Sequence, residues 1–300
     1  MTEPLYPLRI AAAPISWGVC EVPGWGHVLG AETVLAEMAR LGITATELGP
    51  PGYLPDDPVA LRSLLDRFGI RAVGGFLALE LHREPERALT AARRAAELFA
   101  ATGAEVLVLA AATGLNGYDA RPGLDAAEWR TLLHTAAAIR DLAAEHGLRT
   151  AMHPHVGTQV ETEAEVERFL ADSDLDLCLD TGHLLIGGTD PVGLARRHPR
   201  RIGHVHLKDV RADLAREVRS GAVEYSEAVR RGLYAPLGAG DVDIAALVRA
   251  VREAGYRGWF VIEQDTALRP TDPVESASRD AQRSLRYLAD LGVASTSARM

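Results

Sequence analysis

The chain has 300 residues, of which 47% are hydrophobic and 24% charged, a composition typical of a globular protein with a large core. Its 41 acidic residues outnumber 32 basic ones that form no block, so the sequence argues against nucleic-acid binding. It has neither a run of about 18 apolar residues nor a basic leader followed by an apolar segment. We therefore expect a cytoplasmic protein without membrane contact.

The two cysteines, Cys20 and Cys178, are far apart in the chain and have apolar neighbours. Two thiols cannot form a disulfide framework or a thiolate zinc site. We expect both to be small buried side chains.

Short apolar runs alternate with longer amphipathic segments from one end of the chain to the other. The runs predict strands at 9–16, 45–48, 70–79, 105–111, 149–153, 175–180, 202–207 and 258–263. The segments predict helices at 31–42, 57–69, 85–103, 125–147, 162–171, 190–198, 243–255 and 272–292. Several of these helices follow Asp or Thr and several end at Gly, the usual start and stop signals.

Most of these strands are apolar throughout, which predicts a parallel sheet covered by helices. Eight strand–helix units are the number that closes a (β/α)₈ TIM barrel, an α/β fold. We expect a single domain over residues 1–300, with flexible ends at about 1–8 and 293–300. An open doubly wound sheet is the alternative, but the first strand lacks the G-x-G-x-x-G signal of dinucleotide binding.

A connection of unusual length, residues 209–240, follows the seventh strand and is rich in Arg and Glu. Connections this long in compact domains are often functional. A lid over the site is one interpretation, and a surface excursion or a subunit contact is the other.

Polar residues with metal-binding side chains end four successive strands. In a parallel barrel these carboxyl ends converge on the axis and form the active site. The residues at these ends are His153 and His155, Asp180 and His183, His204, His206 and Lys208, and Glu263.

A set such as His153, Asp180, His206 and Glu263 combines carboxylate oxygens with imidazole nitrogens. This combination suits Mn²⁺, Co²⁺, Fe²⁺ or Zn²⁺. Asp180 could instead cap the following turn, and a lone strand-end histidine is more often a hydrogen-bonded core residue. His204 and His206 point to the same face, so their spacing does not separate them.

Several motifs resemble those of the xylose-isomerase-like TIM barrels, the sugar phosphate isomerase/epimerase superfamily, and within it the inosose dehydratases. They are "PISWG" (14–18), "TELGPPGYLP" (46–55), "HPHVGTQVET" (153–162), "LCLDTGHLLIGGTDP" (177–191), "RIGHVHLKDVR" (201–211) and "PLGAGD…GYRGWFVIEQD" (236–265). The resemblance covers about residues 10–290. It implies a metal held by Asp180, His206 and Glu263, with His153 where the superfamily usually has Glu.

The resemblance implies a lyase that dehydrates a polyhydroxylated cyclic ketone such as 2-keto-myo-inositol. Replacing the usual Glu by His153 removes one of the two carboxylates that isomerases and epimerases of the superfamily use for proton transfer. The first loop, "GVCEVPGWG", departs from the Asn-Asp-Asp type stretch of dehydratase-like relatives, so its substrate contacts are expected to differ.

The expected roles follow from this interpretation. His155 or Glu263 would be the base, and His183 or Lys208 the acid or leaving-group partner. Substrate contacts are expected from Trp17, Glu47, His204 and Arg211. For Trp17, packing is an equal alternative. The expected cofactor is Mn²⁺ or Co²⁺, with Zn²⁺ or Fe²⁺ as alternatives. The expected partner is a small polyol or sugar, and a homo-oligomer stays open.

Other functions remain as alternatives. A sugar isomerase, an epimerase or a 3-keto-glycoside lyase would suit the same metal cage. An abasic-site endonuclease would need a basic surface, which the charge of −9 opposes. A non-catalytic sugar-binding barrel is the last alternative.

Overall fold

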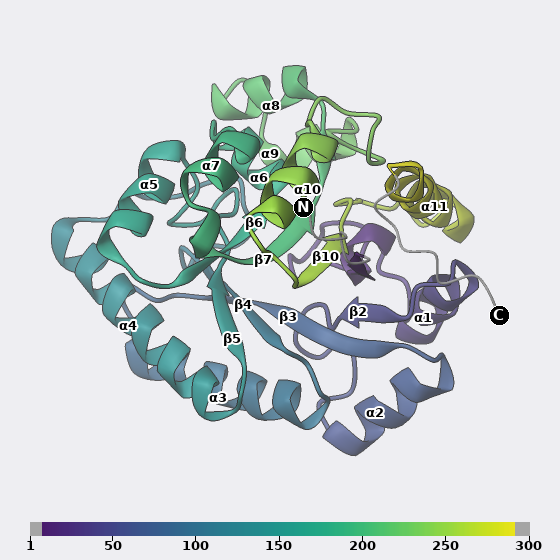
Figure 1. Cartoon of the computed structure of the whole chain (residues 1–300), viewed down its shortest axis with the longest axis horizontal. Coiled ribbons are helices and arrows are strands. Elements are labelled where there is room, and N and C mark those ends of the chain that lie inside the picture. The colour runs from purple at the N-terminus through teal and green to yellow at the C-terminus, as the bar shows by residue number, and fades with distance from the viewer. Residues whose placement is uncertain (1–7, 292–300) are drawn as a thin grey trace, which may run out of the picture.

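The computed structural model describes residues 8–291 and confirms the closed barrel; the open-sheet alternative is wrong. Parallel strands follow one another around the ring in the order β1, β10, β7, β6, β5, β4, β3 and β2. Figure 1 shows these strands at the centre of the molecule, surrounded by helices. The strands are β1 (Arg9–Ala12), β2 (Ala45–Glu47), β3 (Arg71–Leu79), β4 (Val106–Ala111), β5 (Arg149–Met152), β6 (Asp176–Asp180), β7 (Ile202–Leu207) and β10 (Trp259–Ile262).

A helix follows each strand on the outside of the barrel, as predicted. These helices are α1 (Ala31–Arg40), α2 (Pro58–Arg67), α3 (Pro85–Ala101), α4 (Ala126–Glu145), α5 (Glu163–Asp172), α7 (Pro191–Arg197), α10 (Ile244–Glu253) and α11 (Val274–Asp290). The side chains of Asp125 and Thr162 cap α4 and α5 in capping boxes with Glu128 and Glu165. The sequence signals for helix starts were therefore reliable here.

Alternation along the strands decides which side chains enter the barrel. On β4, Val106 and Val108 pack with Cys178 inside the barrel, whereas the intervening Leu107 belongs to the larger core between the strands and the helices. Asp180 lies two residues after Cys178 and shares its side of β6. The strand pattern thus directs the last residue of β6 inward.

The first predicted strand is shorter than expected. It ends at Ala12, and residues Pro14–Trp17 form a 3₁₀ turn, η1. Proline has no N–H to donate to a strand ladder and fits the first turn of a helix, which explains the break. A second 3₁₀ turn, η2 (Pro199–Arg201), precedes β7.

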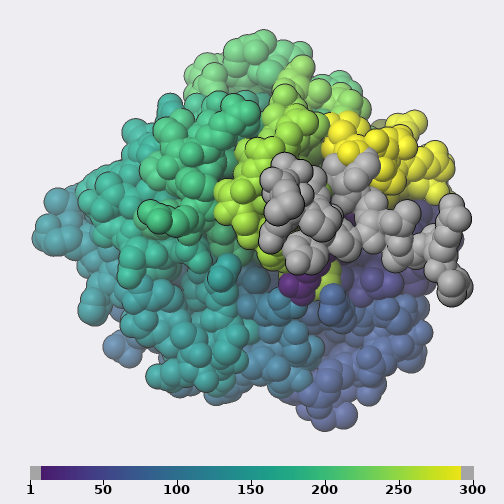
Figure 2. Space-filling model, in the orientation of Figure 1, coloured from purple at the N-terminus to yellow at the C-terminus, as the bar shows by residue number. Residues whose placement is uncertain are grey.

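The 209–240 connection is folded. It pairs β8 (Asp209–Val210) with β9 (Tyr234–Ala235) and contains α8 (Ala212–Arg219) and α9 (Tyr225–Arg230). The carboxylate of Asp209 fastens its end by accepting backbone N–H groups of Gly238, Gly240 and Val242. In Figure 2 this light green segment forms part of the outer rim of the molecule.

None of the helices within residues 8–291 combines the length and apolarity needed to cross a membrane. The ends that were expected to be flexible lie almost entirely outside the described residues.

Candidate active site

Three of the four predicted metal ligands come together where the strands end. The ligand atoms of Asp180 on β6, His206 on β7 and Glu263 just after β10 all lie within 4.8 Å of one another. His206 Nδ1 is 3.0 Å from Glu263 Oε2 and 3.6 Å from Asp180 Oδ2. All three side chains are buried. Distant parts of the chain therefore form one compact group of oxygen and nitrogen donors.

The two oxygens of Asp180 face different partners. Oδ1 accepts the backbone N–H groups of Gly182 and His183 at 2.8 and 2.9 Å, so Asp180 caps the short helix α6 (Thr181–Ile186). Oδ2 faces the donor group. Burial alone would raise the pKa of Asp180, but the Lys208 ammonium and the surrounding histidines together outweigh it and hold the pKa well below its usual range. The capping and ligand interpretations of the sequence are thus compatible.

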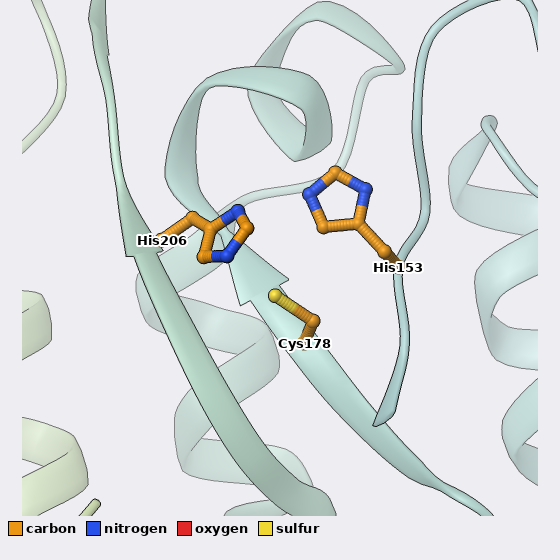
Figure 3. A group of neighbouring side chains, drawn as sticks. All are labelled: His153, Cys178 and His206. Atoms are coloured by element: carbon orange, nitrogen blue, oxygen red, sulfur yellow. The ribbon is translucent and has the colours of Figure 1, made fainter. Parts of the chain in front are cut away.

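His153, the fourth predicted ligand, lies just past the end of β5. Its Nε2 is 3.3 Å from Asp180 Oδ2, so it adjoins the other three residues through Asp180. Figure 3 shows the thiol of Cys178 pointing toward the space between the imidazoles of His153 and His206, and the three donor atoms lie within 4.8 Å of one another. Burial raises the pKa of Cys178 to about 12, so the sulfur keeps its proton and is a weaker ligand than the ionised carboxylates.

The donor group fits a divalent cation. His206 Nδ1 is buried without a hydrogen-bond partner, and the two carboxylates beside it present oxygen atoms. A mixed set of oxygen and nitrogen donors suits Mn²⁺, Co²⁺, Fe²⁺ or Zn²⁺. We conclude that Asp180, His206 and Glu263 could hold such an ion, with His153 at its edge.

Lys208 places a positive charge beside the same carboxylates. Its Nζ lies 2.8 Å from Asp265 Oδ1, 3.1 Å from Glu263 Oε2 and 3.4 Å from Asp180 Oδ2. Burial opposes this charge, but the three carboxylates outweigh it and raise the pKa of Lys208 well above its usual value. The side chain therefore stays an ammonium group and a hydrogen-bond donor.

His155 lies two residues after His153 and lines the cavity. Its Nδ1–H donates to the carbonyl of Val156 at 2.7 Å, which leaves the lone pair on Nε2. Burial is the main reason why the pKa of His155 falls well below its usual value. The ring is thus neutral near pH 7 and equipped to accept a proton.

His183 contacts both His155 and Lys208. Its ring lies against that of His155 with centroids 3.7 Å apart, and its Nε2 accepts a hydrogen bond from Lys208 Nζ at 2.8 Å. It is buried and is not among the residues that line the cavity. This placement favours Lys208 over His183 as the group that meets the leaving hydroxyl.

Glu47, predicted to contact substrate, ends β2 and lines the cavity. Its Oε1 accepts from Nε2 of both His204 and His206, at 2.8 and 3.0 Å. His204 is fully buried and does not line the cavity, so the structure does not support a substrate contact for it.

Two further predicted contacts lie away from the cavity. The buried Trp17 ring packs in the outer core, and its Nε1–H donates to Ser278 of α11 at 3.0 Å. Arg211 is exposed at the start of α8 and does not line the cavity. Trp17 turns away because η1 replaces the expected end of the first strand, and Arg211 because the chain has already left the barrel at β8.

The cavity also has walls that were not among the predicted site residues. Tyr118, from the loop after β4, hydrogen bonds to Glu21 of the first loop and lies over His155, with ring centroids 4.4 Å apart. Tyr225 of α9 donates to Asp265 Oδ2 at 2.8 Å. The remaining aromatic walls are Trp25 and Phe76. The length of the 209–240 connection was the signal for Tyr225, and the unusual first loop was the signal for Glu21 and Trp25; Tyr118 and Phe76 had none.

The fold and this site define a (β/α)₈-barrel enzyme with a candidate metal centre at the carboxyl ends of its strands. The chain belongs to the xylose isomerase-like TIM barrel family, whose profile matches residues 35–291.

Curated relatives cover almost the whole chain. The rhizopine catabolism protein MocC of Rhizobium meliloti is 33% identical over 98% of this chain and 93% of its own. An inosose dehydratase of Geobacillus kaustophilus is 35% identical over 89% of this chain and 91% of its own.

Solved structures show the same fold at lower identity. A D-allulose 3-epimerase from Methylomonas sp. has a TM-score of 0.67 at 18% identity, covering 95% of this chain and 97% of its own. The probable 3-DHS dehydratase AsbF from Bacillus anthracis has a TM-score of 0.69 at 16% identity, covering 94% and 99%.

Proposed function

We propose that this protein is a divalent-metal-dependent dehydratase that removes water from a polyhydroxylated cyclic ketone such as 2-keto-myo-inositol. The observation that carries the proposal is a neutral His155, with its lone pair on Nε2, in the same cavity as His206 and Glu263. The likeness to inosose dehydratases, at 31 to 35% identity over most of the chain, supports it. Such a reaction belongs to inositol catabolism in the cytoplasm.

Asp180, His206 and Glu263 would hold the metal, with His153 as a fourth ligand. When bound, a divalent cation supplies Lewis-acid stabilisation of the negative charge that develops on the ketone oxygen. We expect Mn²⁺ or Co²⁺, with Zn²⁺ or Fe²⁺ as alternatives, because all the donors are carboxylate oxygens and imidazole nitrogens.

His155 is the better of the two predicted bases. Burial alone would raise the pKa of Glu263, but the adjacent His206 and Lys208 outweigh it and lower the pKa, which weakens Glu263 as a base. His155 Nε2 takes the proton from the carbon next to the carbonyl, and the electron pair of that C–H bond forms the enolate.

The β-hydroxyl then leaves as the enolate collapses to the C=C bond. Lys208 donates a hydrogen bond to the departing oxygen, and its raised pKa keeps its own proton in place. The proton that His155 gained passes to this oxygen, so the group leaves as water. His155 is neutral again at the end of the cycle.

The charge of the cavity favours a neutral substrate. Carboxylates of Glu21, Glu47, Glu263 and Asp265 line it, and among the described lining residues Lys208 is the only lysine or arginine. Lys208 is already paired with carboxylates. A phosphate or carboxylate on the substrate would find no free cationic partner, whereas ring hydroxyls find many acceptors. A neutral cyclic polyol ketone is the better match.

The test is incubation of metal-loaded protein with 2-keto-myo-inositol in D₂O, followed by NMR. Loss of water with formation of a diketone is the expected result. The same assay with D-fructose and a 3-keto-glucoside examines the isomerase, epimerase and 3-keto-glycoside lyase alternatives. Exchange of the α-hydrogen for deuterium without elimination, with any of these substrates, would favour an isomerase or epimerase and overturn the dehydratase proposal.

A further inference from the structure

The nitrogen that His206 offers to the metal centre depends on Glu47, a residue on the other side of the barrel. Glu47 ends β2, and His206 lies on β7, three places away around the ring. Glu47 is 1% exposed, so its carboxylate meets these partners without competing bulk water. Its Oε1 lies 3.0 Å from His206 Nε2.

This contact fixes the position of a proton. An ionised carboxylate only accepts hydrogen bonds, so His206 Nε2 must carry a hydrogen. A metal can bind only a ring that has lost one of its two imidazolium protons, so when His206 binds a metal the remaining N–H is on Nε2 and the lone pair is on Nδ1. Nδ1 is the buried nitrogen that faces Glu263 at 3.0 Å and Asp180 at 3.6 Å and has no hydrogen-bond partner.

His204 gives Glu47 a second anchor. It precedes His206 by two residues on the same face of β7, and its Nε2–H donates to the same Oε1 at 2.8 Å. Two imidazoles therefore hold one carboxylate oxygen at a fixed position in the cavity wall. His204, the histidine of β7 that does not line the cavity, thus has a structural role as a partner of Glu47.

We propose that Glu47 is a positioning residue that makes Nδ1 of His206 the metal-binding nitrogen, and that His204 holds Glu47 in place. The proposal rests on the metal centre of the proposed function, but not on the reaction or the substrate. It differs from the sequence-based expectation that Glu47 simply contacts substrate, because it makes metal affinity depend on Glu47 when no sugar is present.

The first test measures Co²⁺ binding to the metal-free full chain by chelator competition, without any sugar. Glu47→Gln keeps the shape of the side chain but removes its charge and allows its amide N–H₂ to face His206. Loss of a partner that orients a metal-binding histidine typically weakens metal affinity about 10- to 100-fold, and we expect this change. The matched control is Glu21→Gln, which removes another carboxylate from the same cavity without touching a histidine; we expect less than about a twofold change.

Wild-type affinity in Glu47→Gln, or an equal loss in both variants, would overturn the proposal. If the wild-type protein is an active dehydratase and Glu47→Gln binds Co²⁺ as tightly as the wild type, this inference is wrong and the proposed function stands. If the variants show the expected Co²⁺ affinities but the wild-type protein has no dehydratase activity, the proposed function is wrong and this inference stands.

The second test needs no substitution at Glu47 and therefore does not depend on how that variant folds. In ¹⁵N-histidine-labelled protein loaded with ¹¹³Cd²⁺, the metal should couple to Nδ1 of His206, and Nε2 should carry the proton. The His206→Gln spectrum assigns the signals. Coupling to Nε2 would show that Glu47 does not select the nitrogen and would overturn the proposal.

Discussion

Replacing Asp180 separates its helix cap from its proposed role as a metal ligand, because Asn can keep the cap without the anionic oxygen and Ala keeps neither. Asp180→Asn removes the anionic oxygen that faces the donor group but retains a side-chain oxygen that can accept from Gly182 and His183. Asp180→Ala removes both. Metal affinity should fall at least ~100-fold in each variant, beyond the range for losing an outer partner of a ligand. Turnover should fall with it.

The two variants should differ in stability. Losing an N-cap costs about 1 kcal/mol. Unfolding a chain of 300 residues has an entropy of roughly 0.6 kcal/mol per degree, from about 2 cal/mol/K per residue. The Ala variant should therefore melt about 2 °C below the Asn variant, with both measured free of metal so that bound ion does not add to the difference.

Asp190 provides the matched control. It caps α7 through the N–H of Val192 at 3.0 Å and does not line the cavity. Asp190→Ala should lower the melting temperature by a similar amount and leave the metal content, measured by elemental analysis, unchanged. Undiminished metal affinity in Asp180→Asn would refute the ligand role, and equal melting of the Ala and Asn variants would refute the cap.

Three further outcomes are expected. His155→Gln should lower kcat by about 10² to 10⁴-fold with unchanged metal content, the usual cost of losing a general base; turnover at the wild-type rate would exclude that role. The acid limb of the kcat/KM profile should lie below pH 6.5, because His155 must be neutral to act as a base and burial lowers its pKa below that value. Activity should therefore persist as the pH falls through 6.5. An acid limb at or above pH 6.5 would contradict the assignment of His155 as the base. Trp17→Phe should lower the unfolding free energy by about 1 to 3 kcal/mol through a lost hydrogen bond and a small void, while KM stays within about twofold; a large KM change would instead place Trp17 against the substrate.

The eight strand–helix units could be predicted from the sequence because the signals that start and end them are local. Caps such as Asp125 and stops such as Gly103 depend on a few neighbouring residues, and the eight predicted helices begin and end within about two residues of the prediction, whereas the short helices α6, α8 and α9 were not predicted. Strand ends were readable for the same reason. Once eight parallel strands close a barrel, the residues at their carboxyl ends must converge, so Asp180, His206 and Glu263 could be grouped without any structure.

What escaped prediction depends on the path of loops and on depth within the barrel. Tyr118 and Tyr225 reach the cavity from segments whose course no periodic pattern encodes. His204 and His206 have the same strand parity, and both contact Glu47; only depth in the barrel distinguishes them, because His206 alone adjoins Asp180 and Glu263 and lines the cavity. Trp17 follows the first strand at the correct end, but a turn that begins at Pro14 directs its ring toward α11.

One pair of contacts joins two parts of the cavity wall that are far apart in the chain. The carboxylate of Asp119 accepts both the backbone N–H and the hydroxyl of Ser226, at 2.8 and 2.7 Å. Tyr118 precedes Asp119 and Tyr225 precedes Ser226, and both tyrosines line the cavity. Any attempt to retarget the enzyme by grafting loops should therefore exchange the two segments as a unit. Grafting either segment alone would leave Asp119 or Ser226 without its hydrogen-bond partner. The adjacent tyrosine ring, Tyr118 or Tyr225, would then lose the contact that fixes its position.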